Sequence, residues 1–201
     1  DEQVIQFTIN WPLQRDVQLE ERLRQRFGLK NALVLRRGEK DHQHTLQRLG
    51  TLGARFLEAT LKDGMTLTVC LGRSTYDVIH AIRPGFQAKV NVVQAMGSMS
   101  FAMQELDSSA LARQLAQKLG GDVTYLASPA VADSVEAANI LSRQPDVQRA
   151  LNAARSAQVA LLGIGNLDPA TSGFVKGGFV SEQEMLELAT SGALGDMGGQ
   201  V

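Results

Sequence analysis

The sequence is poor in cysteine, whose disulfides stabilise many small or secreted proteins. It contains one cysteine, Cys70, in 201 residues, so an intramolecular disulfide cannot form. Aromatic residues are also scarce at 5%, but the chain is 44% hydrophobic, which is enough for an aliphatic core. A chain of this length buries roughly 70% of the surface that its unfolded form exposes. We therefore expect a core that is stable without a disulfide or a metal, with Cys70 as a small buried apolar residue.

Long apolar runs and an excess of one charge are missing as well. No uncharged apolar stretch approaches the roughly 18–20 residues that span a bilayer, and Asp1 and Glu2 do not begin a secretion signal. We therefore expect a cytoplasmic protein that does not contact a membrane. Twenty basic and 21 acidic residues leave a net charge of −1, so the chain lacks the cationic excess on which DNA binding depends. Because it starts at Asp1 rather than Met, we expect a missing N-terminal piece.

Short apolar runs alternate along the chain with segments of helical period. The runs predict strands at 3–10, 32–35, 65–71, 88–95, 122–126 and 159–162. The segments between them predict helices at about 17–27, 46–57, 75–82, 108–119, 131–141, 146–157 and 181–190. Strands of this kind, interleaved with amphipathic helices, indicate an α/β protein with an open, mostly parallel sheet covered on both faces. Ligands of such sheets bind at the carboxyl ends of the strands.

The loop LGRST at 71–75 joins a predicted strand to a predicted helix. Gly72 allows a sharp turn, Ser74 and Thr75 offer hydroxyl groups, and the first amides of the helix carry partial positive charge. Arg73 adds a guanidinium group that matches the geometry of a phosphate. These features suit a phosphate monoester. An ordinary strand-to-helix turn with a Ser or Thr cap explains this loop equally well.

Three further glycine-bearing loops follow predicted elements, at 96–100, at 163–166 and at Gly195-Asp196. A polar small ligand needs donors from several directions and a close approach of the backbone, so loops that converge on one edge would suit it. Tight packing or turn geometry is an equal explanation for Gly165 and Gly195. Catalytic and metal-binding patterns are absent: the three histidines, His42, His44 and His80, have no evident partners. We therefore predict no catalytic residue, no metal site and no cofactor.

Seven motifs, taken in order, resemble the sugar-binding domain of SorC-type transcriptional regulators. They are VIQFTINWP at 4–12, LEERLRQRFGL at 19–29, LGRSTYDVIHAIRP at 71–84, VVQAMGSMS at 92–100, TYLASPAVAD at 124–133, QPDVQRALNAARSAQVALLGIG at 144–165 and SGALGDMGG at 191–199. No motif is decisive alone, but their order and spacing cover nearly the whole chain. The resemblance implies a Rossmann-like domain related to sugar-phosphate isomerases.

The resemblance also implies a function and a set of contacts. It implies one effector-binding domain over 1–201, with a small dimerisation subdomain at about 1–40, that binds a phosphorylated sugar or a similar metabolite. The full protein would be a homodimer or homotetramer and would contact operator DNA through a helix-turn-helix domain absent from this chain. The phosphate would be held by Gly72, Arg73, Ser74 and Thr75. The sugar would be lined by Gly97, Ser98, Met99, Gly163, Gly165, Asn166 and Asp196.

The chain departs from the family pattern in two respects, and two other functions stay open. Arg73 is bulkier than the residue expected beside a phosphate loop, so its side chain either pairs directly with the phosphate or points to solvent. Family members run on past the Gly-Asp motif through another strand and helix, where a lysine often binds the ligand, whereas this sequence stops at Val201. A sugar-phosphate isomerase on the same fold would need an acid and a base; Asp168 stands in the glycine-rich stretch, but no histidine is near it. The third hypothesis is an assembly module whose pocket has lost its ligand.

Overall fold

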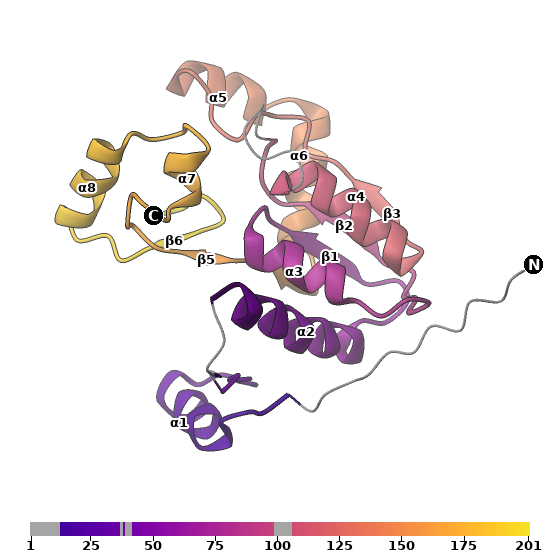
Figure 1. Ribbon diagram of the computed structural model, residues 1–201. Coiled ribbons are helices and arrows are strands. Elements are labelled where there is room, and N and C mark those ends of the chain that lie inside the picture. The colour runs from indigo at the N-terminus through magenta and orange to yellow at the C-terminus, as the bar shows by residue number, and fades with distance from the viewer. Residues whose placement is uncertain (1–12, 37, 39–41, 99–105) are drawn as a thin grey trace, which may run out of the picture.

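A parallel sheet of four strands forms the centre of the structure, a computed structural model that describes residues 13–36, 38, 42–98 and 106–201 (Figure 1). The strands are β1 (Thr66–Val69), β2 (Asn91–Gln94), β3 (Asp122–Thr124) and β4 (Val159–Leu161). They lie in the order β3-β2-β1-β4, and each neighbouring pair is parallel. The expected α/β fold with an open, mostly parallel sheet is confirmed. The expected strand at 3–10 lies outside the described residues.

Helices cover both faces of this sheet (Figure 1). They are α2 (His42–Thr60), α3 (Arg73–Ala81), α4 (Ser108–Leu119), α5 (Val135–Ser142) and α6 (Pro145–Arg155). Helices α3 and α4 connect consecutive parallel strands on one face, and α2 packs on α3. Helix α6 contacts β1 and β2 from the other face, and α5 contacts α6. The carboxyl ends of the strands therefore share one edge, as parallel connections of one hand require.

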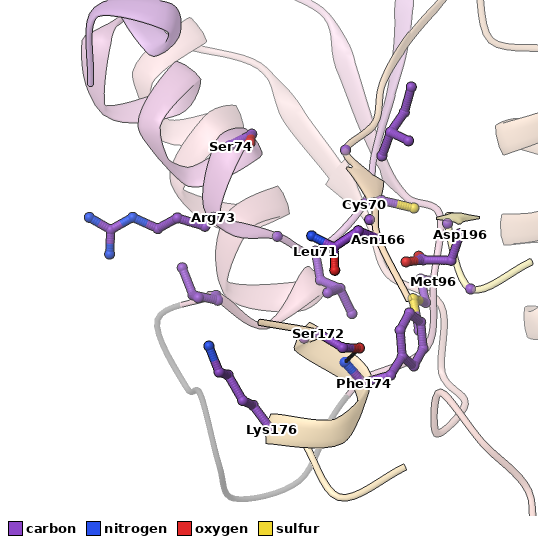
Figure 2. A pocket seen from close by; sticks show the side chains of 18 of the residues that line it. Cys70, Leu71, Arg73, Ser74, Met96, Asn166, Ser172, Phe174, Lys176 and Asp196 are labelled. Carbon is purple, nitrogen blue, oxygen red and sulfur yellow. Dashed lines mark hydrogen bonds between the residues drawn. The ribbon is translucent and has the colours of Figure 1, made fainter. Parts of the chain in front are cut away.

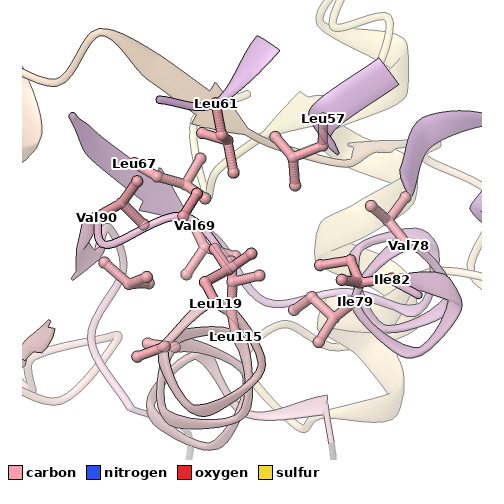
Figure 3. Close-up of a cluster of buried hydrophobic side chains, with 14 of the residues drawn as sticks. Leu57, Leu61, Leu67, Val69, Val78, Ile79, Ile82, Val90, Leu115 and Leu119 are labelled. Atoms are coloured by element: carbon pink, nitrogen blue, oxygen red, sulfur yellow. The ribbon is translucent and has the colours of Figure 1, made fainter. Parts of the chain in front are cut away.

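The main core lies between the sheet and the helices α2, α3 and α4 (Figure 3). Leu67 and Val69 of β1 are fully buried there and meet aliphatic side chains such as Ile79 and Leu115. Thr68 lies between them in the strand, and its hydroxyl donates to the carbonyl of Val93 at 3.1 Å. Each fully buried leucine or isoleucine contributes about 2 kcal/mol by leaving water. This core holds β1 rigidly below the loop that follows it.

The first helix, α1 (Val17–Phe27), begins and ends where the sequence predicts. The Asp16 carboxylate caps it by accepting from the amide of Leu19 at 3.0 Å, and Gly28 ends it with a φ of 64°. The expected strand at 32–35 is wrong: Leu35 forms a single antiparallel bridge with Arg15, outside the sheet. The cause is local, because Glu20 of α1 accepts from the amide of Val34 at 2.8 Å and draws this segment onto α1.

Two other predictions need correction. Helix α5 begins at Val135 rather than at 131, because the Ser134 hydroxyl accepts from the amide of Ala137 and caps the helix there. The expected loop at 163–166 contains a strand, β5 (Ile164–Gly165), which pairs antiparallel with β6 (Asp196–Met197). Between them lie α7 (Gly173–Lys176) and α8 (Glu182–Thr190). The C-terminal elements thus form a separate small unit beside the sheet edge (Figure 1).

The α2–α3 contact is close because two glycines of α2 face α3. A Cβ atom on Gly50 would lie 2.6 Å from the carbonyl carbon of Asp77, and one on Gly53 would lie 2.7 Å from a methyl group of Val78. The Asp77 contact is with backbone, which cannot rotate away. Helix α3, whose first turn begins at the sheet edge, is therefore held in place by α2.

We expect Gly50→Ala to destabilise the protein by about 1–3 kcal/mol. Alanine favours a helix over glycine by about 1 kcal/mol, but overpacking against the Asp77 backbone outweighs that gain. The measurement is urea unfolding followed by circular dichroism. Thr51→Ala on the same helix is the control and should change the free energy of unfolding by less than about 0.5 kcal/mol. Equal stability of Gly50→Ala and the control would contradict the close contact.

Candidate functional site

A cavity of about 380 Å³ opens at the carboxyl ends of the strands, between the start of α3 and the unit formed by β5, β6 and α7 (Figure 2). It is lined by Cys70, Leu71, Gly72, Arg73, Ser74, Met96, Leu106, Gly163, Ile164, Gly165, Asn166, Thr171, Ser172, Gly173, Phe174, Lys176, Asp196, Gly198 and Gly199. Its volume lies within the range of small-molecule sites, roughly 300–1,000 Å³. Seven of the eleven residues expected to bind an effector line it, namely Gly72, Arg73, Ser74, Gly163, Gly165, Asn166 and Asp196.

One wall of the cavity is the first turn of α3. Gly72 precedes the helix with a φ of 138°, a conformation that favours glycine, and its carbonyl accepts from the amide of Tyr76 at 3.0 Å. The amides of Arg73, Ser74 and Thr75 have no carbonyl partner within the helix, because they belong to its first turn. Within the described residues, no side chain caps this turn. The wall therefore presents unpaired N–H groups and the positive end of the helix dipole, together with the hydroxyl group of Ser74.

Arg73 begins at this wall but extends away from the centre of the cavity (Figure 2). Its Nε lies 3.4 Å from Oδ2 of Asp77, and its guanidinium carbon lies 5.3 Å from the centre of the Tyr76 ring. Both partners lie on α3 itself, one and two residues beyond the first turn. The guanidinium group is therefore already paired, which differs from the expectation that it faces a phosphate.

Thr75 is buried at 1% exposure, and its side chain lines a different, apolar cavity between α2 and β4. The Thr75 hydroxyl has no hydrogen-bond partner among the described atoms. Its amide belongs to the first turn of α3, but its side chain is not part of the main cavity lining. The structure thus separates the four residues of the expected phosphate loop: Gly72 and Ser74 line the cavity, Arg73 turns outward, and Thr75 packs behind.

Lys176, at the end of α7, is a cation in the cavity lining that the sequence prediction missed. Its side chain lies on the same side of the cavity as Arg73, and Asp196 lies on the opposite side (Figure 2). The signal was present in the sequence, because Lys176 is the one basic residue in the glycine-rich stretch 163–178. Charge is thus divided across the cavity: Lys176 and the start of α3 lie on one side, and the Asp196 carboxylate lies on the other.

The pairing of β5 with β6 sets the carboxylate side. Gly165 and Asp196 are direct partners in this ladder, and a Cβ atom on Gly165 would lie 1.8 Å from Oδ1 of Asp196. Gly165 is therefore required for space rather than for flexibility. Burial raises the pKa of Asp196, although a hydrogen bond from the amide of Gly199 opposes the shift. Burial also raises the pKa of the nearby Cys70 thiol, and the negative charge of Asp196 adds to that effect.

Asn166 and the turn after it close the rim. Oδ1 of Asn166 accepts from the amide of Asp168 and from the hydroxyl of Thr171, each at 3.0 Å. Its amide nitrogen carries the donors that remain for a ligand. Asp168 is outside the cavity lining. Its carboxylate accepts from the amide of Ala170 at 3.1 Å, and its Oδ2, 3.0 Å from the Thr171 hydroxyl, is the alternative acceptor for that group. The residue considered for isomerase chemistry is therefore engaged in a turn.

The expected sugar contacts at 97–99 are not brought into this cavity. A Cβ atom on Gly97 would lie 2.2 Å from the carbonyl oxygen of Pro129, so this glycine allows two loops to touch. The amide of Ser98 donates to the carbonyl of Ser128 at 3.0 Å, and its hydroxyl accepts from buried Gln94 at 3.1 Å. Met99 lies outside the described residues. Gln94, which the sequence prediction overlooked, thus fixes the loop after β2.

Neither a metal centre nor a membrane span was found in the described part of the chain. Those residues contain no group of three or more His, Cys, Asp or Glu side chains that could hold a metal ion. Within the same residues, no helix combines the length and apolar character needed to cross a bilayer.

We expect Asp196→Asn to stabilise the unligated protein slightly at neutral pH. A carboxyl group whose folded pKa is raised favours folding below its unfolded pKa of about 4, and that contribution is lost as pH rises through the folded pKa. Asparagine cannot ionise, so the melting temperature of the Asp196→Asn variant should exceed that of the parent by about 1–2 °C at pH 7. The difference should vanish below about pH 4. Thermal melts between pH 3.5 and 8 measure it, and a constant difference across that range would contradict the role of ionisation.

Comparisons with known proteins identify the family. The Sugar-bind family model, which describes a sugar-binding domain, matches residues 12–201. The transcriptional regulator LsrR of Klebsiella pneumoniae is 32% identical over 200 residues, which cover 96% of this chain and 58% of that protein. The deoxyribonucleoside regulator of Bacillus subtilis is 24% identical over 164 residues, covering 82% of this chain and 52% of the relative. The chain thus spans between one half and three fifths of these curated relatives, both named as regulators.

Solved structures agree with this assignment. The sugar-binding domain of a transcriptional repressor from Vibrio fischeri matches with a TM-score of 0.80 at 28% identity, over 92% of this chain and 71% of the other. The full-length sorbitol operon regulator SorC from Klebsiella pneumoniae matches with a TM-score of 0.80 at 23% identity, over 90% of this chain and 59% of the other, and shows the shared fold. The chain belongs to the Sugar-bind family of sugar-binding domains, whose model it matches from residue 12 to residue 201.

Proposed function

We propose that this chain is the effector-sensing domain of a bacterial transcription regulator and that it binds a phosphorylated sugar in the cavity beside α3. The observation that carries the proposal is the division of charge across the cavity. Unpaired helix amides and Lys176 lie on one side, and Asp196 lies on the other. A sugar phosphate has the matching division, with an anion at one end and hydroxyl groups along the rest.

The phosphate would lie against the first turn of α3. Helix N-termini bind anions because their free N–H groups point outward and the helix dipole favours negative charge there. Ser74 adds a hydroxyl donor, and Lys176 adds a full positive charge on the same side of the cavity. Hydrogen bonds to a charged group contribute about 1.5–3 kcal/mol each. This is enough to distinguish a phosphorylated sugar from its unphosphorylated parent.

The sugar hydroxyls would lie toward the β5–β6 pair. The Asp196 carboxylate accepts hydrogen bonds from hydroxyl groups, and Asn166 can donate through its side-chain nitrogen. Because Gly165 has no side chain, the sugar can also approach the backbone of β5. The main-chain pairing of β5 with β6 holds these groups together, so their spacing does not depend on the ligand.

A ligand in this position would join two parts of the fold. Its phosphate would touch α3, on the sheet, and its hydroxyls would touch the C-terminal unit of β5, β6 and α7. A ligand shifts an equilibrium between two arrangements only by its difference in affinity for them, and a ligand that bridges two elements prefers the closed arrangement. The closed arrangement would change how the subunits of a homodimer or homotetramer are arranged. That change would alter the affinity of a helix-turn-helix domain outside this chain for operator DNA in the cytoplasm. The dimerisation role of 1–40 remains a prediction.

The first test is isothermal titration calorimetry with pentose and hexose phosphates and their unphosphorylated parents. We expect at least one phosphate to bind about 100-fold more tightly than its parent, because two charge-assisted hydrogen bonds are lost with the phosphate. Equal binding of a phosphate and its parent would contradict the proposal. So would the absence of binding by every phosphate, or turnover of one to an isomer.

The second test separates the two cations of the lining. Lys176→Met should weaken the bound phosphate about tenfold or more, because methionine keeps the length of the side chain and removes its charge. Arg73→Met is the matched control and should weaken binding less than about threefold, because the Arg73 guanidinium is paired with Asp77 and Tyr76. A larger loss at Arg73 than at Lys176 would show that the outward arginine, not the lysine, meets the phosphate.

A further inference from the structure

A second cavity of about 300 Å³ adjoins the main one, and the proposed sugar phosphate would not fill it. The two cavities share Met96, Phe174, Gly198 and Gly199 as lining residues. The boundary is thin: a Cβ atom on Gly199 would lie 3.4 Å from Cε of Met96 and 3.8 Å from Cζ of Phe174. Two flexible or rotatable side chains and a glycine turn are therefore what separates the cavities.

The second cavity lies on the sugar side of the main one. Gly198 and Gly199 follow Asp196 in the chain after one intervening residue, Met197. Met96 and Phe174 lie on the Asp196 side of the view, away from Arg73 and Lys176 (Figure 2). A substituent that left the sugar toward this boundary would point away from the phosphate. The second cavity, whose lining includes Gly97 from the expected sugar contacts, is thus an extension of the site at the end opposite to the anion.

The described lining of the second cavity offers no ionic partner for a charged group. Its described lining contains no ionisable side chain and is mainly aliphatic, with Leu126, Leu141, Val147 and Leu151 among its residues. Its two serine hydroxyls already donate within the protein, Ser128 to the carbonyl of Pro129 at 3.1 Å and Ser142 to the carbonyl of Asn139 at 3.0 Å. Burying an unpaired charge in such surroundings costs far more free energy than burying an apolar group there.

We infer that the effector carries an uncharged, largely apolar substituent opposite its phosphate, and that the cavity behind Met96 and Phe174 binds it. The ligand class is therefore a phosphorylated glycoside or a similar sugar phosphate with an apolar group. The inference rests on the proposed function, because the phosphate sets the direction in which the ligand lies. Helix α5 forms the outer wall through Ala138 and Leu141, and it has no buried residue, so it can adjust to such a group.

The test compares methyl and phenyl glycosides of the pentose 5-phosphate or hexose 6-phosphate that binds most tightly in calorimetry, each as both anomers. In the parent protein we expect one phenyl glycoside to bind about tenfold or more tightly than its methyl counterpart, because the ring leaves water in the second cavity. Ala138→Phe, which fills that cavity, should abolish the preference. Ala137→Phe is the matched control: it lies one residue away on α5, outside the cavity lining, and should keep the preference.

Each outcome has one meaning. A phenyl preference that is lost in Ala138→Phe and kept in Ala137→Phe supports the inference. The inference about the second cavity is overturned if the methyl and phenyl glycosides bind equally, or if the preference survives in Ala138→Phe and its milder form Ala138→Met. Either result leaves the proposed phosphate site unaffected. If no sugar phosphate binds at all, the proposed function and the inference both fall. Melting temperatures within about 3 °C of the parent confirm that the variants are folded.

Discussion

The parallel alignment of β1, β2 and β4 is the constraint on which the rest of the structure depends. Parallel strands that share a register end at the same edge, so the segments after β1 and β4 meet there although they are some 90 residues apart in the chain. The aliphatic core beneath β1 and the glycine contact between α2 and α3 keep this edge rigid (Figure 3). A helix start can serve as an anion site only when it is held in this way.

The cavity at that edge combines a rigid wall with a wall built from a separate unit. The rigid wall is the first turn of α3, and the other consists of β5, β6 and α7, which form few contacts with the sheet itself. Charge divides along the same line, with cationic and N–H groups on one side and Asp196 on the other. A ligand that satisfies both sides ties the C-terminal unit to the sheet. This coupling gives a sensor a physical means of reporting its occupant.

Polar groups in the cavity and behind it are buried at a cost in stability. The pKa of Asp196 is raised because folding removes its carboxylate from water. The Thr75 hydroxyl, which lies behind the cavity, is buried with no partner among the described atoms. Buried polar groups of this kind cost stability. They contrast with Glu20, whose pKa is lowered by Arg15 in a purely structural contact.

The sequence by itself determined the α/β class, the helix boundaries at Asp16, Gly28 and 108–119, and the family. These features depend on local chemistry: the period of apolar residues, a capping side chain, or a glycine in a left-handed turn. Tertiary structure alone decided which loop residues share a cavity. Gly97 packed against Pro129, and Lys176 entered the lining from α7, because these positions follow from how separate elements pack rather than from neighbours in the chain.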